Sequence, residues 1–587
     1  MTTPTLAAAI DKYQRGDNAS ARTEVEAVLA SEPENAPAWY LAGVLRGLAG
    51  ERAAALAALE RSVALAPGDA GAQGNLGRLL LELGRPADAI RALERATELN
   101  AEDAGVWQSL GTARQATGDS AGTIKALQRA MQIEPRNVRI VNELANLHTA
   151  ENDLRTAEPL LRSALELEPQ SARAHVRLAR LLGVLGGHAQ ARALVERAVA
   201  LDPGFALGHA VLSAALRNQG DNPGAVAAAR RAIELEPTLA LGHVNFALAE
   251  LRLYRYESAL AAFDAAIAYD PANVDAHWNR GMLLIKLGRM KEGFADYEWR
   301  YRSQLFFGGK PRPIPTHPRP ESFAGKRLVM LAEQGFGDTI MYLRYAKLAA
   351  ALGAEVTAQV RPPLRNLAAW VAGVSAVAIT DDPTPALDIA ISTLSMPFVM
   401  GTTLETIPAE VPYIAVPEGE RARWRRWLEA LPRPRIGLCW QGNPQNPNDY
   451  NRSLPVPALA PLVAKSKAGF VSLQKGPGEG QLGPAGLAGR VKDPAAELED
   501  FTDTAALIAA LDLVISVDTS IAHLAGALAR PVWTLVPYGP DYRWMLERSD
   551  TPWYPTMRLF RQQRPEDWSA PIRAVVAALR EFKAPAR

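Results

Sequence analysis

The sequence predicts an α-solenoid followed by an α/β region of two facing Rossmann-like lobes. Three observations predict this fold class: a 34-residue period in the first half, a proline- and glycine-rich stretch that ends it, and two later series of short apolar strands that alternate with helices. A period of this length is typical of stacked helical pairs. The alternation of strands and helices is typical of parallel sheets covered by helices.

The 34-residue period is carried by prolines and by small side chains. The prolines that share one register are Pro33, Pro67, Pro135, Pro169, Pro203, Pro237 and Pro271, and Ala101 stands at the position that breaks the series. Glycine or alanine recurs at three further offsets, and these small side chains let the two helices of a pair cross closely. The proline ends the second helix of each pair. This pattern resembles the tetratricopeptide repeat. We expect eight repeats or slightly more between about residues 2 and 302, stacked into a solenoid.

The second half predicts two lobes. The expected domains are the solenoid at 1–304, an extended linker at 305–322, a first lobe at 323–416, an inter-lobe helix at 417–433, a second lobe at 434–565 and a C-terminal helix at 566–587. Strands are predicted at RLVMLA, AEVTAQV, SAVAI and LDIAIS, and then at RIGLCW, GFVSLQ, LDLVISV and PVWTLVP, with a helix over 338–352. Ligands of such sheets bind at the carboxyl ends of the strands.

Composition excludes several classes of function and location. The net charge of +1 gives no reason to expect nucleic acid or an anionic membrane as the main partner. The single cysteine, Cys439, can form no internal disulfide, which fits a reducing compartment. The N-terminal segment has no basic stretch followed by an apolar core, and no apolar run approaches the roughly 18 residues that span a bilayer. We therefore expect a cytoplasmic protein without a membrane span.

A glycine loop follows the first predicted strand, in LAEQGFGD. Gly335 and Gly337 precede Asp338, and Ile340 stands where a dinucleotide-binding loop needs a third glycine. A carboxylate at a helix start would repel a pyrophosphate, so the loop predicts the approach of a ligand to Asp338. The alternative is that Asp338 only caps the helix and that the glycines only form a tight turn.

Polar residues also follow the strands of the second lobe. They are Gln441, Asn443 and Arg452 after the first strand, Lys475 after the next, and Asp518, Thr519, Ser520 and His523 after LDLVISV. Thr519 and Ser520 open a predicted helix, whose N-terminus and hydroxyl groups suit a phosphate. Arg452 and Lys475 carry charge that complements a diphosphate. In the alternative, Asp518 is an N-cap, His523 is a hydrogen-bonded core histidine, and the two cations are surface charges.

Two motifs resemble one family of enzymes. The segment ISVDTSIAHLAGALARPVW resembles the signature of the heptosyltransferase-like glycosyltransferases, family 9, which have the GT-B fold. EQGFGD resembles their first-lobe loop, in which the aspartate is taken as the general base. The resemblance implies that Asp338 is the base, that the residues of the second lobe named above bind a nucleotide sugar, and that no metal is needed. If Asp338 is only a helix cap, Glu333 in the same cleft is the next candidate for the base. No DxD-type metal motif is set in a first-lobe loop, and the aspartate pair Asp381–Asp382 in TDDPTP is expected to form a turn.

The layout also resembles a protein-modifying enzyme, the eukaryotic O-linked N-acetylglucosamine transferase, in which an asparagine ladder lines the repeats. The corresponding position here holds Asn75, Asn245 and Asn279, but other residues stand there in the middle repeats. Asparagine can pair with an extended peptide, so these three residues predict an acceptor groove. Because the ladder is broken, a folded or helical acceptor read by side chains is an equal expectation.

The sequence thus predicts a protein O-glycosyltransferase whose repeats recruit the acceptor. The whole chain resembles bacterial repeat proteins, some of which are soluble flagellin glycosyltransferases that add nonulosonic acids to serine and threonine. One alternative is a transferase that acts on a lipid-linked or small saccharide, and another is a repeat scaffold whose GT-B half does not catalyse. No cofactor is expected beyond the nucleotide-sugar co-substrate. The sugar, its CMP, UDP or ADP carrier, the acceptor, the stereochemical outcome and the oligomeric state stay open.

Overall fold

The structure is a computed structural model that describes residues 5–303, 312–380, 382, 387–446 and 448–584. It divides into two compact units, Met1–Ala249 and Glu250–Arg587, here called the N-terminal unit and the C-terminal unit. Residues 305–311 of the predicted linker lie outside the described residues, and so does Asp381. Residues 312–319 form no helix or strand, and a short 3-10 turn follows at Pro320–Phe323.

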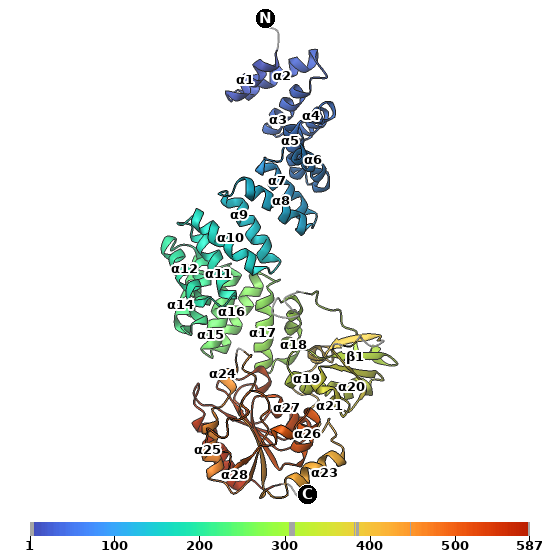
Figure 1. Cartoon of the computed structure of the whole chain (residues 1–587), viewed down its shortest axis with the longest axis vertical. Helices are drawn as coiled ribbons and strands as arrows, with labels where there is room; N and C mark the ends of the chain where they lie inside the picture. The colour runs from blue at the N-terminus through green and yellow to red at the C-terminus, as the bar shows by residue number, and fades with distance from the viewer. Residues whose placement is uncertain (1–4, 304–311, 381, 383–386, 447, 585–587) are drawn as a thin grey trace. The chain divides into compact units, whose positions relative to one another are not determined.

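The N-terminal unit is a succession of paired helices, as the 34-residue period predicts (Figure 1). They are α1 (Leu6–Gln14), α2 (Asn18–Ser31), α3 (Ala36–Leu48), α4 (Arg52–Leu65), α5 (Ala70–Glu82), α6 (Pro86–Leu99), α7 (Ala104–Ala116), α8 (Ser120–Ile133), α9 (Val138–Ala150), α10 (Leu154–Leu167), α11 (Ala172–Val184), α12 (His188–Leu201), α13 (Ala206–Asn218), α14 (Asn222–Leu235) and α15 (Ala240–Arg252), the last of which extends past the unit's end. The small residues explain the close pairing: a Cβ on Gly43 would lie 2.7 Å from Leu59 Cγ. Polar caps begin the first helices of the pairs, as where Asp69 accepts the Ala72 N–H at 3.1 Å.

The last repeats belong to the C-terminal unit. These are α16 (Tyr256–Tyr269), α17 (Val274–Lys286) and α18 (Met290–Tyr297), followed by the 3-10 turn η1 (Glu298–Arg302). Phe294 and Tyr297 are buried in one apolar cluster with Leu328 and Met330 of the first sheet. The compact units therefore divide near residue 249, within the repeats, because the aromatic end of the repeats is part of the α/β core.

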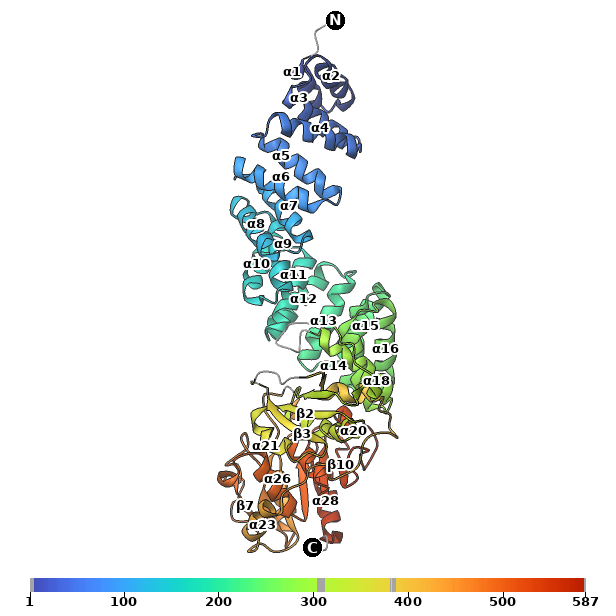
Figure 2. The ribbon, with the colours of Figure 1, turned by 90° about the vertical axis from the view of Figure 1, so that its right-hand side faces the viewer.

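Two parallel sheets form the rest of the C-terminal unit (Figure 2). The first has the order β3-β2-β1-β4, with β1 (Arg327–Leu331), β2 (Glu355–Val360), β3 (Val374–Ile379) and β4 (Ile389–Ser392). The second has the order β10-β9-β8-β5-β6-β7, with β5 (Arg435–Cys439), β6 (Gly469–Ser472), β7 (Val491–Lys492), β8 (Leu513–Val517), β9 (Val532–Val536) and β10 (Met557–Arg561). The two-lobed α/β prediction is confirmed.

The helices of the lobes differ in detail from the prediction. They are α19 (Phe336–Tyr342), α20 (Tyr345–Ala351), α21 (Arg365–Ala368), α22 (Met396–Val399), α23 (Glu418–Trp427), α24 (Asp449–Arg452), α25 (Ala460–Ala464), α26 (Phe501–Ala510), α27 (Ser520–Ala527) and α28 (Ser569–Glu581). The prediction of a single helix over 338–352 is wrong, because the structure has two helices there. The break between them lies near Arg344, whose buried side chain donates to the Trp553 carbonyl at 2.6 Å. The edge strands β7 and β10 escaped prediction because one has two residues and the other carries arginines.

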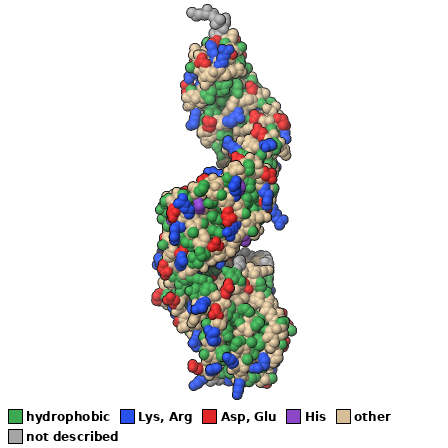
Figure 3. Space-filling model, turned by 90° about the vertical axis from the view of Figure 1, so that its left-hand side faces the viewer, with side chains coloured by type: hydrophobic (Ala, Val, Ile, Leu, Met, Phe, Trp, Pro, Cys, Tyr) green, Lys and Arg blue, Asp and Glu red, His purple; other side chains and the backbone are tan. Residues whose placement is uncertain are grey.

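The surface agrees with the composition. Figure 3 shows acidic and basic side chains interspersed on one face of the molecule, without a field of one sign. Among the described residues, no helix is both long and apolar enough to cross a membrane.

Truncated chains test whether the end of the repeats and the first lobe share one apolar core. We expect residues 238–587, which keep all of α15 to α18, to melt cooperatively, and residues 305–587 to be insoluble or to lack a cooperative transition. The shorter chain exposes the apolar surface that Phe294 and Tyr297 cover, and burial of one such side chain contributes about 1.5–3 kcal/mol. Circular dichroism melts of both chains provide the measurement, with residues 1–237 as the complementary fragment. Equal melting temperatures for the two longer fragments would place the boundary at 304 after all.

Candidate active site

The two lobes face each other through the first turns of α19 and α27. Each helix follows a strand of its own sheet, β1 and β8. A Cβ on Gly337 would lie 2.9 Å from His523 Cδ2 and 3.4 Å from Ser520 Cα. The second glycine of the loop is therefore required by the approach of α27. The sequence predicted that this space admits a ligand; the structure fills it with the opposite lobe.

Asp338 is the third residue of α19, and Gly335 is the N-cap. Its Oδ2 accepts the Gly335 N–H at 3.1 Å, which satisfies a free donor of the first turn. Its Oδ1 forms an ion pair with the Arg543 guanidinium of the second lobe. The Asp338 and Arg543 side chains are only 13% and 12% exposed. Asp338 thus caps its helix and ties the two lobes together.

Arg543 and Asp541 belong to the site, although sequence reasoning missed them. Arg543 lies in the 3-10 turn η8 (Tyr542–Trp544), which follows β9, and Asp541 is the cap of that turn. Asp541 Oδ1 accepts the backbone N–H of Arg543 at 3.1 Å and its Nη1 at 2.6 Å. Burial lowers the pKa of Arg543 to about 10. The signal that could have found them is their place after β9, at the same carboxyl edge as Asp518.

Two carboxyl groups, Asp518 and Asp541, influence each other at this edge. Burial raises the pKa of Asp518, and burial together with the charge of Asp518 raises the pKa of Asp541 to about 7. The charge of Arg452 lowers both pKa values, and its Nε donates to Asp449 Oδ1 at 3.0 Å. The predicted residues Arg452 and Asp518 thus act electrostatically on the same group, Asp541.

The first turn of α27 holds the other predicted residues of this strand exit. Thr519 is the N-cap: its Oγ1 accepts the Ile521 N–H at 3.3 Å and lies 3.1 Å from Ser516 Oγ. Ser520 is half-buried, and no hydrogen bond joins its hydroxyl to any residue that the structure describes. Ser520 is thus the hydroxyl of this turn that is available to a ligand.

His523 fits the alternative of a core histidine. Its ring is buried, its Nδ1 is hydrogen-bonded to the Tyr554 hydroxyl at 3.1 Å, and it stacks on Trp544 with ring centroids 5.2 Å apart. Burial, with smaller contributions from Arg344 and Arg452, lowers the pKa of His523 to about 3. His523 is therefore neutral at physiological pH and helps to pack η8 against α27.

Three predicted donor-binding residues make local hydrogen bonds. Gln441 Oε1 accepts from Gln481 at 2.8 Å, and Asn443 is exposed and accepts the Gln445 N–H at 3.0 Å. Lys475 is exposed, and its Nζ donates to the Ala495 carbonyl at 2.6 Å. Partners within the second lobe thus bond to groups of Gln441, Asn443 and Lys475 that a ligand would use.

Glu333, the second candidate base, is bound on both oxygens. Arg300 donates to its two carboxylate oxygens at 2.9 and 3.0 Å, and Ser392 donates to one of them. The Arg300 side chain is fully buried and also pairs with Glu298 at 2.6 Å. Glu333 therefore anchors the end of the repeats to the first lobe, and its geometry does not suit a free base.

The predicted acceptor asparagines are also engaged. Asn75 donates to the Tyr40 hydroxyl at 2.7 Å, and Asn245 donates to the Ala210 carbonyl at 2.8 Å, each one repeat back along the chain. Asn279 donates to the Asp275 carbonyl of its own helix at 2.8 Å. The amide N–H groups of Asn75 and Asn245 thus join neighbouring repeats, whereas that of Asn279 bonds within its own helix. That the three residues read an acceptor peptide stays a prediction.

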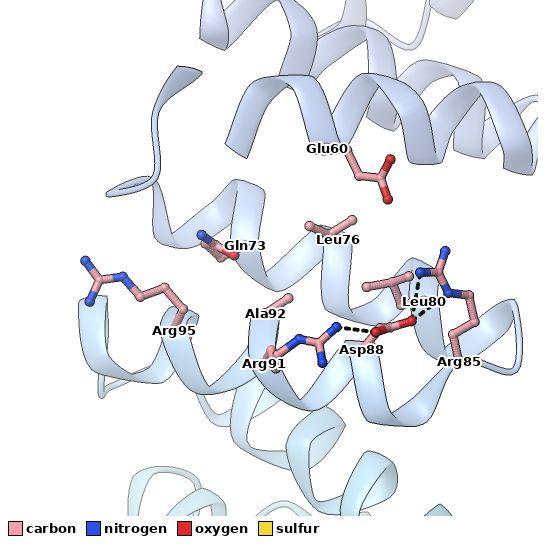
Figure 4. Close-up of a pocket in the computed structure, with 9 residues that line it drawn as sticks. All are labelled: Glu60, Gln73, Leu76, Leu80, Arg85, Asp88, Arg91, Ala92 and Arg95. Atoms are coloured by element: carbon pink, nitrogen blue, oxygen red, sulfur yellow. Dashed lines mark hydrogen bonds and ion pairs between the residues drawn. The ribbon is translucent and has the colours of Figure 1, made fainter. Parts of the chain in front are cut away.

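A groove of about 310 Å³ lies elsewhere in the N-terminal unit (Figure 4). It is lined by Glu60, Gln73, Leu76, Leu80, Arg85, Asp88, Arg91, Ala92 and Arg95, from α4, α5 and α6. Asp88 pairs with both Arg85 and Arg91, as Figure 4 shows, so much of the charge of the groove is compensated within it. Asn75 is not among its lining residues.

No cluster of three or more histidine, cysteine, aspartate or glutamate side chains suited to a metal ion occurs in the part of the chain that the structure describes. The residues that converge on the facing helices are instead Asp338, Arg452, Asp518, Ser520, Asp541 and Arg543. These residues combine carboxylates with cations. The cations can bind an anion, and a neighbouring carboxylate can accept a proton.

Comparisons with known proteins agree with this division. Residues 6–70, 48–112, 148–215 and 244–299 match tetratricopeptide repeat families, and residues 495–566 match glycosyltransferase family 9 (heptosyltransferase). Protein FlbA of Caulobacter vibrioides is 26% identical over 317 residues, which are 50% of this chain and 53% of that protein. The chain thus spans about half the length of the curated relative that it matches.

Two solved repeat structures are similar to part of the chain. One is YrrB, described as a tetratricopeptide repeat protein with an unusual peptide-binding site, at 18% identity over 31% of this chain and 95% of that chain, with a TM-score of 0.29. The other is a tetratricopeptide repeat protein from Parabacteroides merdae, at 16% identity over 39% and 90%, with a TM-score of 0.32.

Proposed function

We propose that this chain, which joins tetratricopeptide repeats to a glycosyltransferase family 9 domain, is a protein O-glycosyltransferase. It would move a sugar from a nucleotide-sugar donor to a serine or threonine of an acceptor protein that the repeats recruit. The observation that carries the proposal is the convergence of Asp338 from one lobe with Arg543, Arg452 and Ser520 from the other. A nonulosonic acid donor and a flagellin acceptor are the first pair to test.

In the proposed reaction, the acceptor hydroxyl oxygen bonds to the anomeric carbon of the sugar. The bond between that carbon and the phosphate oxygen breaks, and the nucleotide leaves with the electron pair. Asp338 takes the hydroxyl proton, while Arg452 and Arg543 stabilise the charge on the leaving phosphate. Fixed cations would thus supply the charge stabilisation that a metal ion supplies in other transferases.

The ion pair between Asp338 and Arg543 sets the order of events. In the structure, Arg543 pairs with Asp338. A donor phosphate that binds Arg543 would weaken this pair and free Oδ1 of Asp338 for the acceptor. The loop around Gly337 would have to move away from Ser520 to admit the donor, because the two are in contact.

A second candidate function is a scaffold whose transferase domain does not catalyse. The observation that favours it is that both carboxylates at the exit of β1, Glu333 and Asp338, are ion-paired. In that case the interlobe pair is permanent, and the domain serves only to present the repeats.

A donor panel separates the two candidates. The full chain is incubated with flagellin and with a CMP-linked nonulosonic acid, a UDP-linked hexosamine or an ADP-linked heptose, and nucleotide release and the intact mass of flagellin are measured. The proposal expects a mass increase of one sugar residue with one donor. Nucleotide release without a change in the mass of flagellin would point to another acceptor. No release with any donor, under conditions in which the chain remains folded, would favour the scaffold.

Ser520→Ala tests the donor site. We expect donor affinity to fall by about 10–100-fold, since a hydrogen bond to a charged group contributes about 1.5–3 kcal/mol. Thr519→Ala is the poorer test, because Thr519 caps α27 and its loss costs about 1 kcal/mol of stability. Ser569→Ala, at the first residue of α28, is the matched control. Isothermal calorimetry gives the affinities, and equal values for Ser520→Ala and the native chain would place the phosphate elsewhere.

A further inference from the structure

We propose that Lys286, from the last full repeat, completes a pocket with Arg452 and Arg543 that binds an oxyanion of the donor. The inference rests on the proposed function, because it concerns the same cleft. It adds that the repeats contribute a side chain to the donor site, in addition to recruiting an acceptor. Nothing in the family 9 match covers this residue, since that match begins at residue 495.

Lys286 is a half-buried cation without an anionic partner. It is the last residue of α17, and its Nζ lies 5.3 Å from the centroid of the Tyr256 ring. No hydrogen bond or ion pair joins its ammonium group to any of the described residues. The contact with an aromatic face compensates only part of the lost hydration, since a cation–π contact contributes about 0.5–2 kcal/mol.

The end of α17 lies against the segment that carries Asp541 and Arg543. A Cβ on Gly288, two residues beyond Lys286, would lie 3.1 Å from Met545 Cε. The charge of Lys286 also acts directly on Asp541, as does that of Arg452. Three cations from different parts of the fold therefore act on one carboxyl group: Arg543 of η8 through an ion pair with Asp541, and Lys286 of α17 and Arg452 of α24 through their charges.

Lys286 differs from the other two cations in its pairing. Arg452 pairs with Asp449, and Arg543 pairs with both Asp338 and Asp541, whereas no ion pair joins Lys286 to a described residue. Burial and the charge of Asp518 raise the pKa of Asp541. Burial in turn lowers the pKa of Lys286. An oxyanion bound beside Lys286 would supply the missing counter-charge, and the Asp541 side chain, 31% exposed, shows that the place is open to solvent.

Two groups of the proposed donor carry such oxygens: the phosphate of the nucleotide and the carboxylate of an acidic sugar. CMP alone presents the phosphate, and free N-acetylneuraminate, a nonulosonic acid, presents the carboxylate. We therefore measure the binding of each compound to the full chain by isothermal calorimetry, for the native sequence and for Lys286→Met. Lys291→Met, an exposed lysine of α18, is the matched control, and Lys286→Arg keeps the charge.

The expected result is a loss of affinity of about 10-fold or more in Lys286→Met for one of the two compounds. The compound whose affinity falls identifies the group that is bound. The affinities of Lys291→Met and Lys286→Arg should stay within about threefold of the native chain. Melting curves show whether all variants fold. Native-like affinity of Lys286→Met for both compounds, or no binding of either by the native chain, would overturn the inference. Binding that depends on Lys286 without any sugar transfer would preserve this pocket and contradict the proposed function alone.

Discussion

Asp338→Asn is expected to lower turnover by about 10²–10⁴-fold, the usual contribution of a general base. The asparagine keeps the shape of the side chain, and its oxygen can still accept the Gly335 N–H that the carboxylate accepts at 3.1 Å. It removes the negative charge that pairs with Arg543. Because the donor phosphate no longer competes with Asp338 for that guanidinium, donor affinity should hold or rise while turnover falls. Steady-state kinetics with saturating donor, together with calorimetry, measure the two effects separately.

Asp388→Asn provides the control for that experiment. Asp388 also pairs with an arginine of the first lobe, Arg327, at 3.1 Å, but it lies at the start of β1, at the opposite end of the strand from the glycine loop. It should leave turnover unchanged. If Asp338→Asn turns over at the native rate, Asp338 is only a helix cap and an interlobe contact. Glu333 would be an unsuitable replacement, since Arg300 occupies both of its oxygens.

Arg300→Met is expected to destabilise the C-terminal unit by about 3–5 kcal/mol, the usual cost of removing one partner of a buried ion pair. Arg300 is fully buried between Glu298 and Glu333, donates to Ser395 Oγ at 2.7 Å and lies over the Tyr297 and Tyr301 rings. Methionine fills a similar volume but removes the guanidinium that pairs with Glu298 and Glu333, which leaves Glu298 with His317 at 2.7 Å and Glu333 with Ser392. Both pKa values would then have to rise for the fold to persist.

Chemical denaturation of the full chain, followed by tryptophan fluorescence, measures this loss. Arg327→Met is the matched control, because its partner Asp388 lies on the surface and such pairs contribute little. A double variant, Arg300→Met with Glu333→Gln, should recover part of the stability by removing one unpaired charge. Equal stability of Arg300→Met and Arg327→Met would mean that the aromatic contacts of the repeat end hold the two parts together without the ion pairs.

The sequence alone determined the architecture, because its signals are local and repeated. The 34-residue register of prolines and small residues identified the paired helices, since each helix needs the same small side chain where its partner crosses. Apolar runs that end in polar residues located β1, β5, β6 and β8, and the exits after β1 and β8 pointed to Asp338 and Ser520. A two-residue edge strand such as β7 has too few side chains to show a pattern.

Only the tertiary structure decided which of the polar residues meet. Lys475 and Asn443 follow buried strands just as Asp518 does, yet their bonds are to Ala495 and Gln445 within the same lobe. Arg543 stands 205 residues from Asp338, and no periodicity links two residues so far apart. The pairing exists because α19 and α27 pack end to end across the lobes, with Gly337 allowing the contact. The sequence fixes local conformation through short-range sterics and hydrogen bonds, whereas the partners of a charge depend on which surfaces the buried core brings together.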